Sequence, residues 1–163
     1  MRYLGMILLL TASVLIGNAV AKSKEIRVKR LYQLERLCSE IATELRFLLP
    51  PIQQLIRTIA MRKEFEDMRF LQSAAAETDA FPVSWQSAVR QDRQCTPEER
   101  EMLYFLGNSL GTTDLEGQLA VLGQCATRFA SLRQDAERNL ASHTRLARSL
   151  GLFGGLFLVV MLI

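Results

Sequence analysis

The sequence predicts an all-α protein: a multi-helix antiparallel bundle with an N-terminal and a C-terminal membrane segment. Apolar residues recur at steps of three and four, and no segment alternates as a half-buried strand does. Two runs without charge occupy the ends of the chain, at 3–21 and 149–163. We therefore expect an N-terminal transmembrane helix at 1–21, a cytoplasmic helical-bundle domain at 22–148 and a short C-terminal membrane segment at 149–163.

The two terminal runs differ in length. The first, from Tyr3 to Ala21, has 19 residues, close to the roughly 20 that a helix needs to cross the hydrocarbon core. The second, from Ser149 to Ile163, has 15 residues. As a helix it reaches about 22 Å, which is short of the core thickness of about 30 Å. Local thinning, snorkelling of Arg148 or partial insertion would each make up the difference.

Positive charge is concentrated beside both runs. Five basic residues follow the first run: Lys22, Lys24, Arg27, Lys29 and Arg30. We expect them to form a membrane-surface anchor, and the positive-inside rule then places the large domain in the cytoplasm. The basic residues before the second run agree with this orientation; they are Arg138, Arg145 and Arg148. Residues 31–148 carry 14 basic and 16 acidic side chains, so no basic face is left for nucleic acid.

A second interpretation of the N-terminus is open. Ala19-Val20-Ala21 has the A-x-A pattern of a signal-peptide cleavage site. Cleavage there would make the rest of the chain a secreted or extracytoplasmic helical protein, acting as an envelope interaction module. The basic block that follows opposes translocation, and only Arg2 precedes the run. We therefore favour an uncleaved membrane helix.

The polar stretch begins with an amphipathic helix. Its apolar residues repeat every seven positions; they are Leu31, Leu34, Cys38, Ile41, Leu45 and Leu48. Pro50-Pro51 should end this helix, and a second helix follows the prolines. A third short helix is predicted over 65–75, and a brief fourth begins at Pro82 and carries Trp85.

Capping sequences mark the last two helices. Thr96 and Glu99 form a capping box with proline at the first helical position, and Gly111 is placed to end that helix. Thr113 with Glu116 predicts a second capping box, after which one long helix runs into the C-terminal segment. Since the first and last helices both meet the membrane, we expect them to pair antiparallel, with the shorter helices alongside or at the distal end.

No residue pattern indicates catalysis or a cofactor. His143 is the one histidine, and it lacks the further ligands that a metal site needs. Cys38, Cys95 and Cys125 are widely spaced and odd in number, which favours reduced thiols over a disulfide framework. P-loop and G-x-G-x-x-G sequences are absent. The sequence predicts a non-enzyme without cofactor or metal.

Three acidic residues begin one predicted helix: Glu98, Glu99 and Glu101. They suit a helix N-terminus and solvent, and their alternative role is a docking surface for a basic partner.

Glycines in the C-terminal run have the spacing that lets membrane helices approach closely; they are Gly151, Gly154 and Gly155. Pairing with Gly5, Gly17 or another chain, as in a homo-oligomer, is one interpretation, and lipid-facing glycines are the other. Gly107 and Gly111 share this spacing, but there we expect a helix terminus rather than a contact face.

Several segments follow one another in a specific order over essentially the whole chain: the N-terminal apolar run with its basic flank, the Leu31–Leu48 helix with its Pro50-Pro51 stop, Ser84-Trp85-Gln86-Ser87-Ala88-Val89, Leu106-Gly107-Asn108-Ser109-Leu110-Gly111, Asp114 and Gln118, and Ser149-Leu150-Gly151 before the apolar tail. In this order they resemble the stage III sporulation protein AB family of endospore-forming bacteria.

The resemblance implies a cytoplasmic domain similar to the F-domain of type II secretion and type IV pilus platform proteins. It implies a non-enzymatic platform or adaptor in the channel complex between mother cell and forespore, in the mother-cell membrane around the forespore. Such platforms pass motion from a cytoplasmic secretion ATPase to membrane components. The implied partners are stage III sporulation protein AA, the companion ATPase, and other membrane proteins of the same operon.

Overall fold

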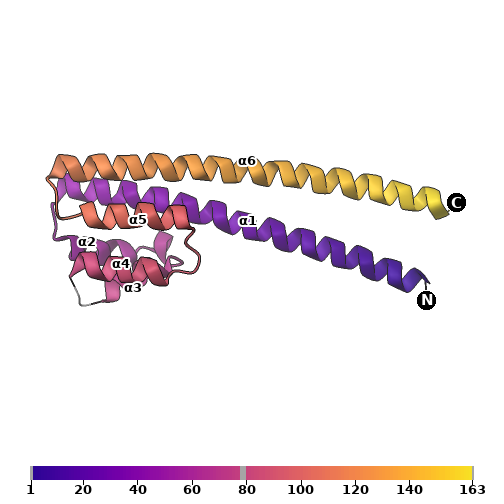
Figure 1. Ribbon diagram of the computed structural model, residues 1–163, viewed down its shortest axis with the longest axis horizontal. Coiled ribbons are helices and arrows are strands. Elements are labelled where there is room, and N and C mark those ends of the chain that lie inside the picture. Colours follow the sequence, from indigo (N-terminus) through magenta and orange to yellow (C-terminus); the bar gives the residue numbers. More distant parts are fainter. Residues whose placement is uncertain (1, 78–79, 163) are drawn as a thin grey trace. The chain divides into compact units, whose positions relative to one another are not determined.

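The structure, a computed structural model, describes the backbone of residues 2–77 and 80–162 and the side chains of 22–77 and 80–140. Its described residues contain helices and no strand, which confirms the all-α class. The elements are α1 (Arg2–Phe47), α2 (Ile52–Ala60), the 3-10 turn η1 (Lys63–Phe65), α3 (Arg69–Ala76), α4 (Phe81–Gln91), α5 (Pro97–Ser109) and α6 (Leu115–Leu162) (Figure 1). The chain separates into two units, a bundle of Arg30–Ser131 and a second unit of Met1–Lys29 with Leu132–Ile163.

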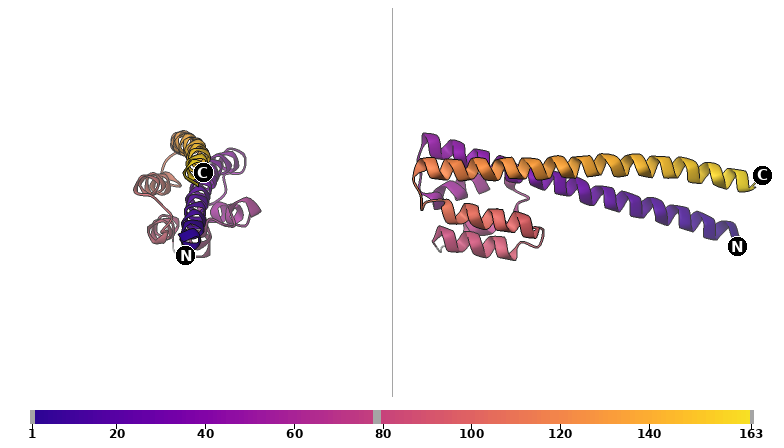
Figure 2. Two further views of the ribbon diagram at one scale, coloured as in Figure 1. Left: turned by 90° about the vertical axis from the view of Figure 1, so that its right-hand side faces the viewer. Right: turned by 45° about the horizontal axis from the view of Figure 1, so that its top comes forward.

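Neighbouring helices of the Arg30–Ser131 bundle run antiparallel. On α4 and α5, Gln86 bonds Asn108 near one end, and the backbone of Asp92 accepts from Arg100 near the other. Helices α5 and α6 are also antiparallel, since Glu98 at the start of α5 pairs with Arg128, more than three turns into α6. Within the bundle, α6 returns alongside the C-terminal half of α1 (Figures 1 and 2). The predicted antiparallel helical bundle is therefore present.

The stripe predicted on the first helix forms one wall of the core. Five of its six residues are at most 3% exposed: Leu31, Leu34, Cys38, Ile41 and Leu45. Leu48 was expected to continue the stripe, but it is 70% exposed because α1 ends at Phe47. Leu49 adopts φ 42°, in the left-handed region that bulky residues rarely occupy, and Pro50-Pro51 then lead into α2.

The third predicted helix is divided into two elements. η1 ends at Phe65 and α3 begins at Arg69, with a non-helical Met68 between them. The side-chain amide of Gln72 donates to the carbonyl oxygens of Ala60 at 2.7 Å and Phe65 at 3.3 Å. The Phe65 carbonyl also accepts from the Met68 N–H at 3.0 Å, so the carbonyl oxygens at the ends of α2 and η1 are both hydrogen-bonded.

The caps of the last two helices were predicted with mixed success. The Thr96–Glu99 capping box of α5 is confirmed, and Gly111 follows that helix with φ 77°. The second capping box is wrong, because α6 starts at Leu115 and its N-cap is Asp114. The Asp114 carboxylate accepts from the Gly117 N–H at 3.0 Å, while the Thr113 hydroxyl donates to the Ser109 carbonyl oxygen at 3.3 Å. Aspartate is also at least as good an N-cap as threonine.

The membrane segments predicted at 1–21 and 149–163 lie outside the residues whose side chains the structure describes. Within the described part of the chain, no helix has the length and apolar character needed to cross a membrane. The helices α1 and α6 extend their backbone through both apolar runs.

Candidate functional site: a buried ionic network and an acidic groove

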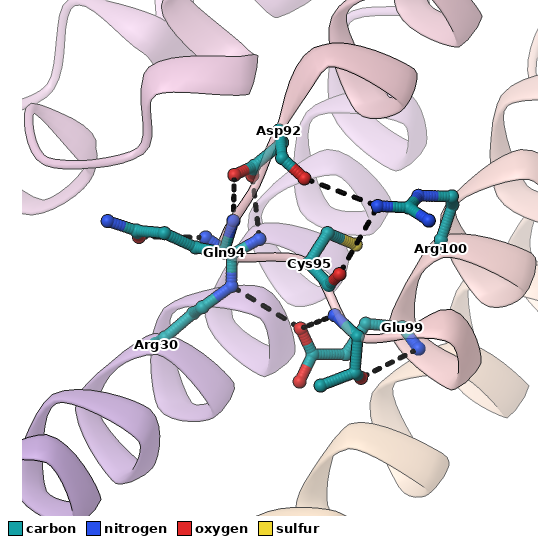
Figure 3. A network of polar contacts seen from close by, with 7 residues as sticks. Arg30, Asp92, Gln94, Cys95, Glu99 and Arg100 are labelled. Carbon is teal, nitrogen blue, oxygen red and sulfur yellow. Dashed lines mark hydrogen bonds and ion pairs between the residues drawn. The ribbon is translucent and has the colours of Figure 1, made fainter.

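Arg30 reaches from α1 to the turn between α4 and α5 (Figure 3). Its Nη2 lies 2.7 Å from Asp92 Oδ2, its Nη1 lies 3.2 Å from Gln94 Oε1, and its Nε lies 3.4 Å from Glu99 Oε2. The residue is 8% exposed. Arg30 was predicted to anchor the chain at a membrane surface, but it is enclosed in the bundle, where it binds two carboxylates.

The Arg30 guanidinium is buried but paired with acidic side chains. Burial lowers the pKa of the Arg30 guanidinium, but its hydrogen bond to Asp92 and the charges of Asp92 and Glu99 outweigh this and raise the pKa above its ordinary value. Glu99 is fully buried and also accepts from the backbone N–H of Thr96 at 3.3 Å. Arg100 donates to the carbonyl oxygens of Asp92 and Cys95, each at 3.4 Å. We call the six residues labelled in Figure 3 the Arg30 network: Arg30, Asp92, Gln94, Cys95, Glu99 and Arg100.

The three glutamates at the start of α5 differ in burial, because Glu99 is buried. Glu99 is buried inside the bundle, where its carboxylate accepts from the backbone at the start of α5, so it cannot contact a partner protein. Glu98 and Glu101 are exposed, and Glu98 accepts an ion pair from Arg128 on α6. The capping-box position of Glu99 is visible in the sequence, but its ion pair is not, because Arg30 lies on another helix.

The other predicted site residues belong to the second unit. Lys22 and Lys29 are exposed, and Lys24 and Arg27 are half-buried, so a membrane-surface role for these four stays a prediction. The side chains of His143 and of the three glycines predicted to pack against a membrane helix lie outside the described residues; the glycines are Gly151, Gly154 and Gly155.

An open groove of about 740 Å³ lies between α5 and α6. Glu98, Glu101, Met102 and Phe105 line it from α5, and Gly123 and Arg128 are among its residues on α6. We call it the α5–α6 groove. Phe105 is 47% exposed, and beyond its own stretch of helix a Cβ added at Gly123 would meet nothing within 4 Å. The groove therefore combines accessible apolar surface with a carboxylate rim.

The opposite side of α5 is closely packed around Trp85. The indole Nε1 donates to the Leu103 carbonyl oxygen at 2.7 Å, and the Phe70 ring meets the indole edge-on with centroids 5.5 Å apart. Gly107 packs so tightly that an added Cβ would lie 2.2 Å from Trp85 Cδ1. Gly107 was expected at a helix terminus, but it is a contact residue inside α5, and only the facing tryptophan reveals that role.

The three cysteines are buried and make poor nucleophiles. Burial raises the pKa of Cys125 to about 11 and raises that of Cys38 further. The pKa of Cys95 is also raised by burial, against the opposing charge of Arg30. Near neutral pH such thiols carry little thiolate, which is the reactive form. Among the described side chains, no cluster of histidine, cysteine, aspartate and glutamate suits a metal ion.

Comparison with known proteins assigns the chain to a family. The family model described as Stage III sporulation protein AB matches residues 2–163. The chain belongs to the stage III sporulation protein AB family. The Stage III sporulation protein AB of Bacillus subtilis (strain 168) is 22% identical over 169 residues, which cover 99% of each chain. No solved structure matches.

In this member of the stage III sporulation protein AB family, three of the segments that carried the resemblance meet inside the bundle. The tryptophan segment of α4 packs on the Leu106–Gly111 segment of α5, through Trp85 with Gly107 and Gln86 with Asn108. Gln118 accepts from the Gly111 N–H at 3.1 Å and donates to the Thr113 carbonyl oxygen at 2.8 Å, which closes the turn into α6. The recognisable residues therefore specify the fold around α5.

Proposed function

We propose that this sporulation protein is a non-enzymatic, membrane-anchored platform or adaptor in the channel complex between mother cell and forespore. Residues 1–21 cross the mother-cell membrane around the forespore, residues 149–163 enter it, and the 22–148 domain lies in the mother-cell cytoplasm. The domain couples a cytoplasmic secretion ATPase to membrane components. Membership of a stage III sporulation family supports the biological setting.

The observation that carries this proposal is the continuity of the two long helices. α1 is unbroken from Arg2 to Phe47, and α6 from Leu115 to Leu162. Each helix therefore joins an apolar terminal run to the bundle without a loop. A hydrogen-bonded helix resists bending far more than a flexible linker does, so a displacement of the bundle is passed on to the terminal run.

The Arg30 network supports the same role at the point where α1 enters the bundle. It ties α1 to the α4–α5 turn through two carboxylates, Asp92 and Glu99. Removing one member of a buried ion pair costs about 3–5 kcal/mol, so sliding of α1 against α5 is opposed at this point. The chain has no P-loop sequence to hold ATP, so the energy for movement comes from a partner, by resemblance the stage III sporulation protein AA ATPase.

The topology can be tested with a cysteine placed at Ser39, an exposed position on α1. The three native cysteines are buried, so a membrane-impermeant maleimide should report the new thiol. We expect labelling in inverted membrane vesicles and not in intact cells, with the parent protein as the matched control. Labelling from outside the cell would overturn the cytoplasmic placement. A mature protein that starts at Lys22 would instead support the secreted alternative suggested by Ala19-Val20-Ala21.

Coupling to the ATPase has a separate test. Full-length protein in detergent micelles should co-purify with stage III sporulation protein AA from sporulating cells, and the affinity tag alone in the same detergent should not. Absence of association over a range of salt concentrations would contradict the ATPase part of the proposal and leave the topology standing.

A further inference from the structure

We infer that the α5–α6 groove binds a helix of a partner protein that carries a bulky apolar side chain beside a lysine or arginine. The inference rests on the proposed function, because an adaptor needs surfaces for other subunits of its complex. It assigns one such surface to residues of α5 and α6 that lie within a single compact unit, the Arg30–Ser131 bundle.

The floor of the groove is apolar and accessible. Leu103 and Leu106 of α5 are fully buried, but Phe105 is 47% exposed and lies in the groove beside Met102. Cys125 forms part of the floor from α6, where its thiol faces the Met102 carbonyl oxygen at 4.0 Å. Apolar area left in water gains free energy when a partner covers it, and a bulky apolar side chain fits this floor.

The rim of the groove favours a cationic partner. Glu98 and Glu101 stand on the same face of α5 as Met102 and Phe105, since the positions follow one another at helical spacing. Arg128 pairs with Glu98, and among the described residues no ion pair engages Glu101. A lysine or arginine of the partner can pair with Glu101 while its apolar neighbour contacts Phe105.

The spacing of these groups favours a helix as the bound element. The acidic rim and the apolar floor are offset by about one helical turn along α5, from Glu101 to Phe105. A partner helix repeats with the same period, so a cation and an apolar residue three or four positions apart match both groups. On the other wall, Gly123 leaves open space, which allows a helix to approach α6 closely.

Gly123 also provides the sharpest way to test the groove. Because Gly123 is exposed in the groove and an added Cβ meets nothing beyond its own stretch of helix, we expect Gly123→Phe to occupy the groove and leave the core unchanged. Ser73→Phe on α3 is the matched control, since Ser73 is an exposed helical position outside the groove. Glu101→Lys reverses the rim charge at an exposed site and remains informative if Gly123→Phe fails to fold.

The experiment introduces the photocrosslinking residue benzoylphenylalanine at Thr127, an exposed residue of the groove, in full-length protein in sporulating cells. We expect an adduct that mass spectrometry maps to a helix of another protein, with lysine or arginine within one turn of the crosslinked apolar residue. Gly123→Phe should reduce its yield at least tenfold and Glu101→Lys at least fivefold, and Ser73→Phe should leave it unchanged.

Four outcomes would overturn the inference: no adduct, an adduct with lipid, an adduct with a second copy of this chain, or an adduct that survives both groove variants. Membrane fractionation and co-purification with the ATPase, measured on the same variants, separate this result from the proposed function. If both remain intact and the adduct is absent, only the groove assignment is wrong. If the parent protein itself is not in the membrane, the proposed function is wrong.

Discussion

Helix α5 has two very different sides in the bundle. Toward α4, Trp85 fills the space so completely that Gly107 has no room for one more carbon atom. Toward α6, Gly123 opens onto a groove where an added carbon meets nothing, and Phe105 stays half-exposed. Close packing therefore requires glycine at position 107 of α5, whereas the fold places no such requirement on Gly123 of α6.

This difference separates residues that maintain the bundle from residues that are available to a partner. The packed side contains Trp85 and Gly107, two of the residues that carried the family resemblance. The open side combines apolar surface with charge, which is the composition of many protein-binding sites. Substitutions on the packed side should therefore change stability, and those on the open side should change binding. The following predictions are ordered by the size of the expected effect.

Trp85→Ala should have the largest effect. The indole is fully buried and contacts Phe70 and Phe81, so its removal leaves a cavity and costs about 3–5 kcal/mol of the free energy of unfolding. Urea unfolding of the full-length protein in detergent micelles, followed by circular dichroism, measures the loss. Trp85→Phe keeps an aromatic ring and should lose less; equal losses for the two variants would contradict packing as the cause.

Arg30→Ala should destabilise the bundle by about 3 kcal/mol, since it leaves the buried Glu99 and Asp92 carboxylates without their cation. Unfolding can be followed by the fluorescence of Trp85, the one tryptophan. In a background with Asp92→Asn and Glu99→Gln, the same substitution should cost much less, because no buried carboxylate is left. A loss that is unchanged in that background would show that the charges are not responsible.

Gly107→Ala should destabilise by about 1–2 kcal/mol, because overpacking against Trp85 outweighs the better helix propensity of alanine. The matched test is the same substitution in the Trp85→Ala background. There the clash is gone, and the substitution should become neutral or stabilising when measured by circular dichroism. A cost that persists without the tryptophan would contradict the packing explanation.

Gly123→Ala should have the smallest effect and the opposite sign. At this exposed helical position alanine meets no neighbour, so the protein should gain about 0.5–1 kcal/mol from helix propensity alone. The unfolding midpoint in urea measures it, beside Gly107→Ala in the same background. A destabilising result would mean that the groove is closed in solution.

The positions of the helices could be predicted from the sequence because their signals are local. The stripe from Leu31 repeats at steps of three and four residues, and the double proline and the Thr96–Glu99 capping box each lie within a single turn. The errors were also local: Asp114 replaces Thr113 as the N-cap of α6, and the third helix is divided at Met68. In both places several polar groups compete for the same backbone partners, and small energy differences decide.

The sequence by itself determined that this chain is a helical bundle between two apolar ends, and its ordered segments indicated the family. Only the tertiary structure decided the roles of Arg30, Glu99 and Gly107. Arg30 is 62 residues from Asp92 and 69 from Glu99 along the chain, and the role of Gly107 depends on Trp85 of another helix. Whether a charge is paired in the core or exposed to solvent depends on such distant partners, because burial and Coulomb energy are set by distance in space and not by position in sequence.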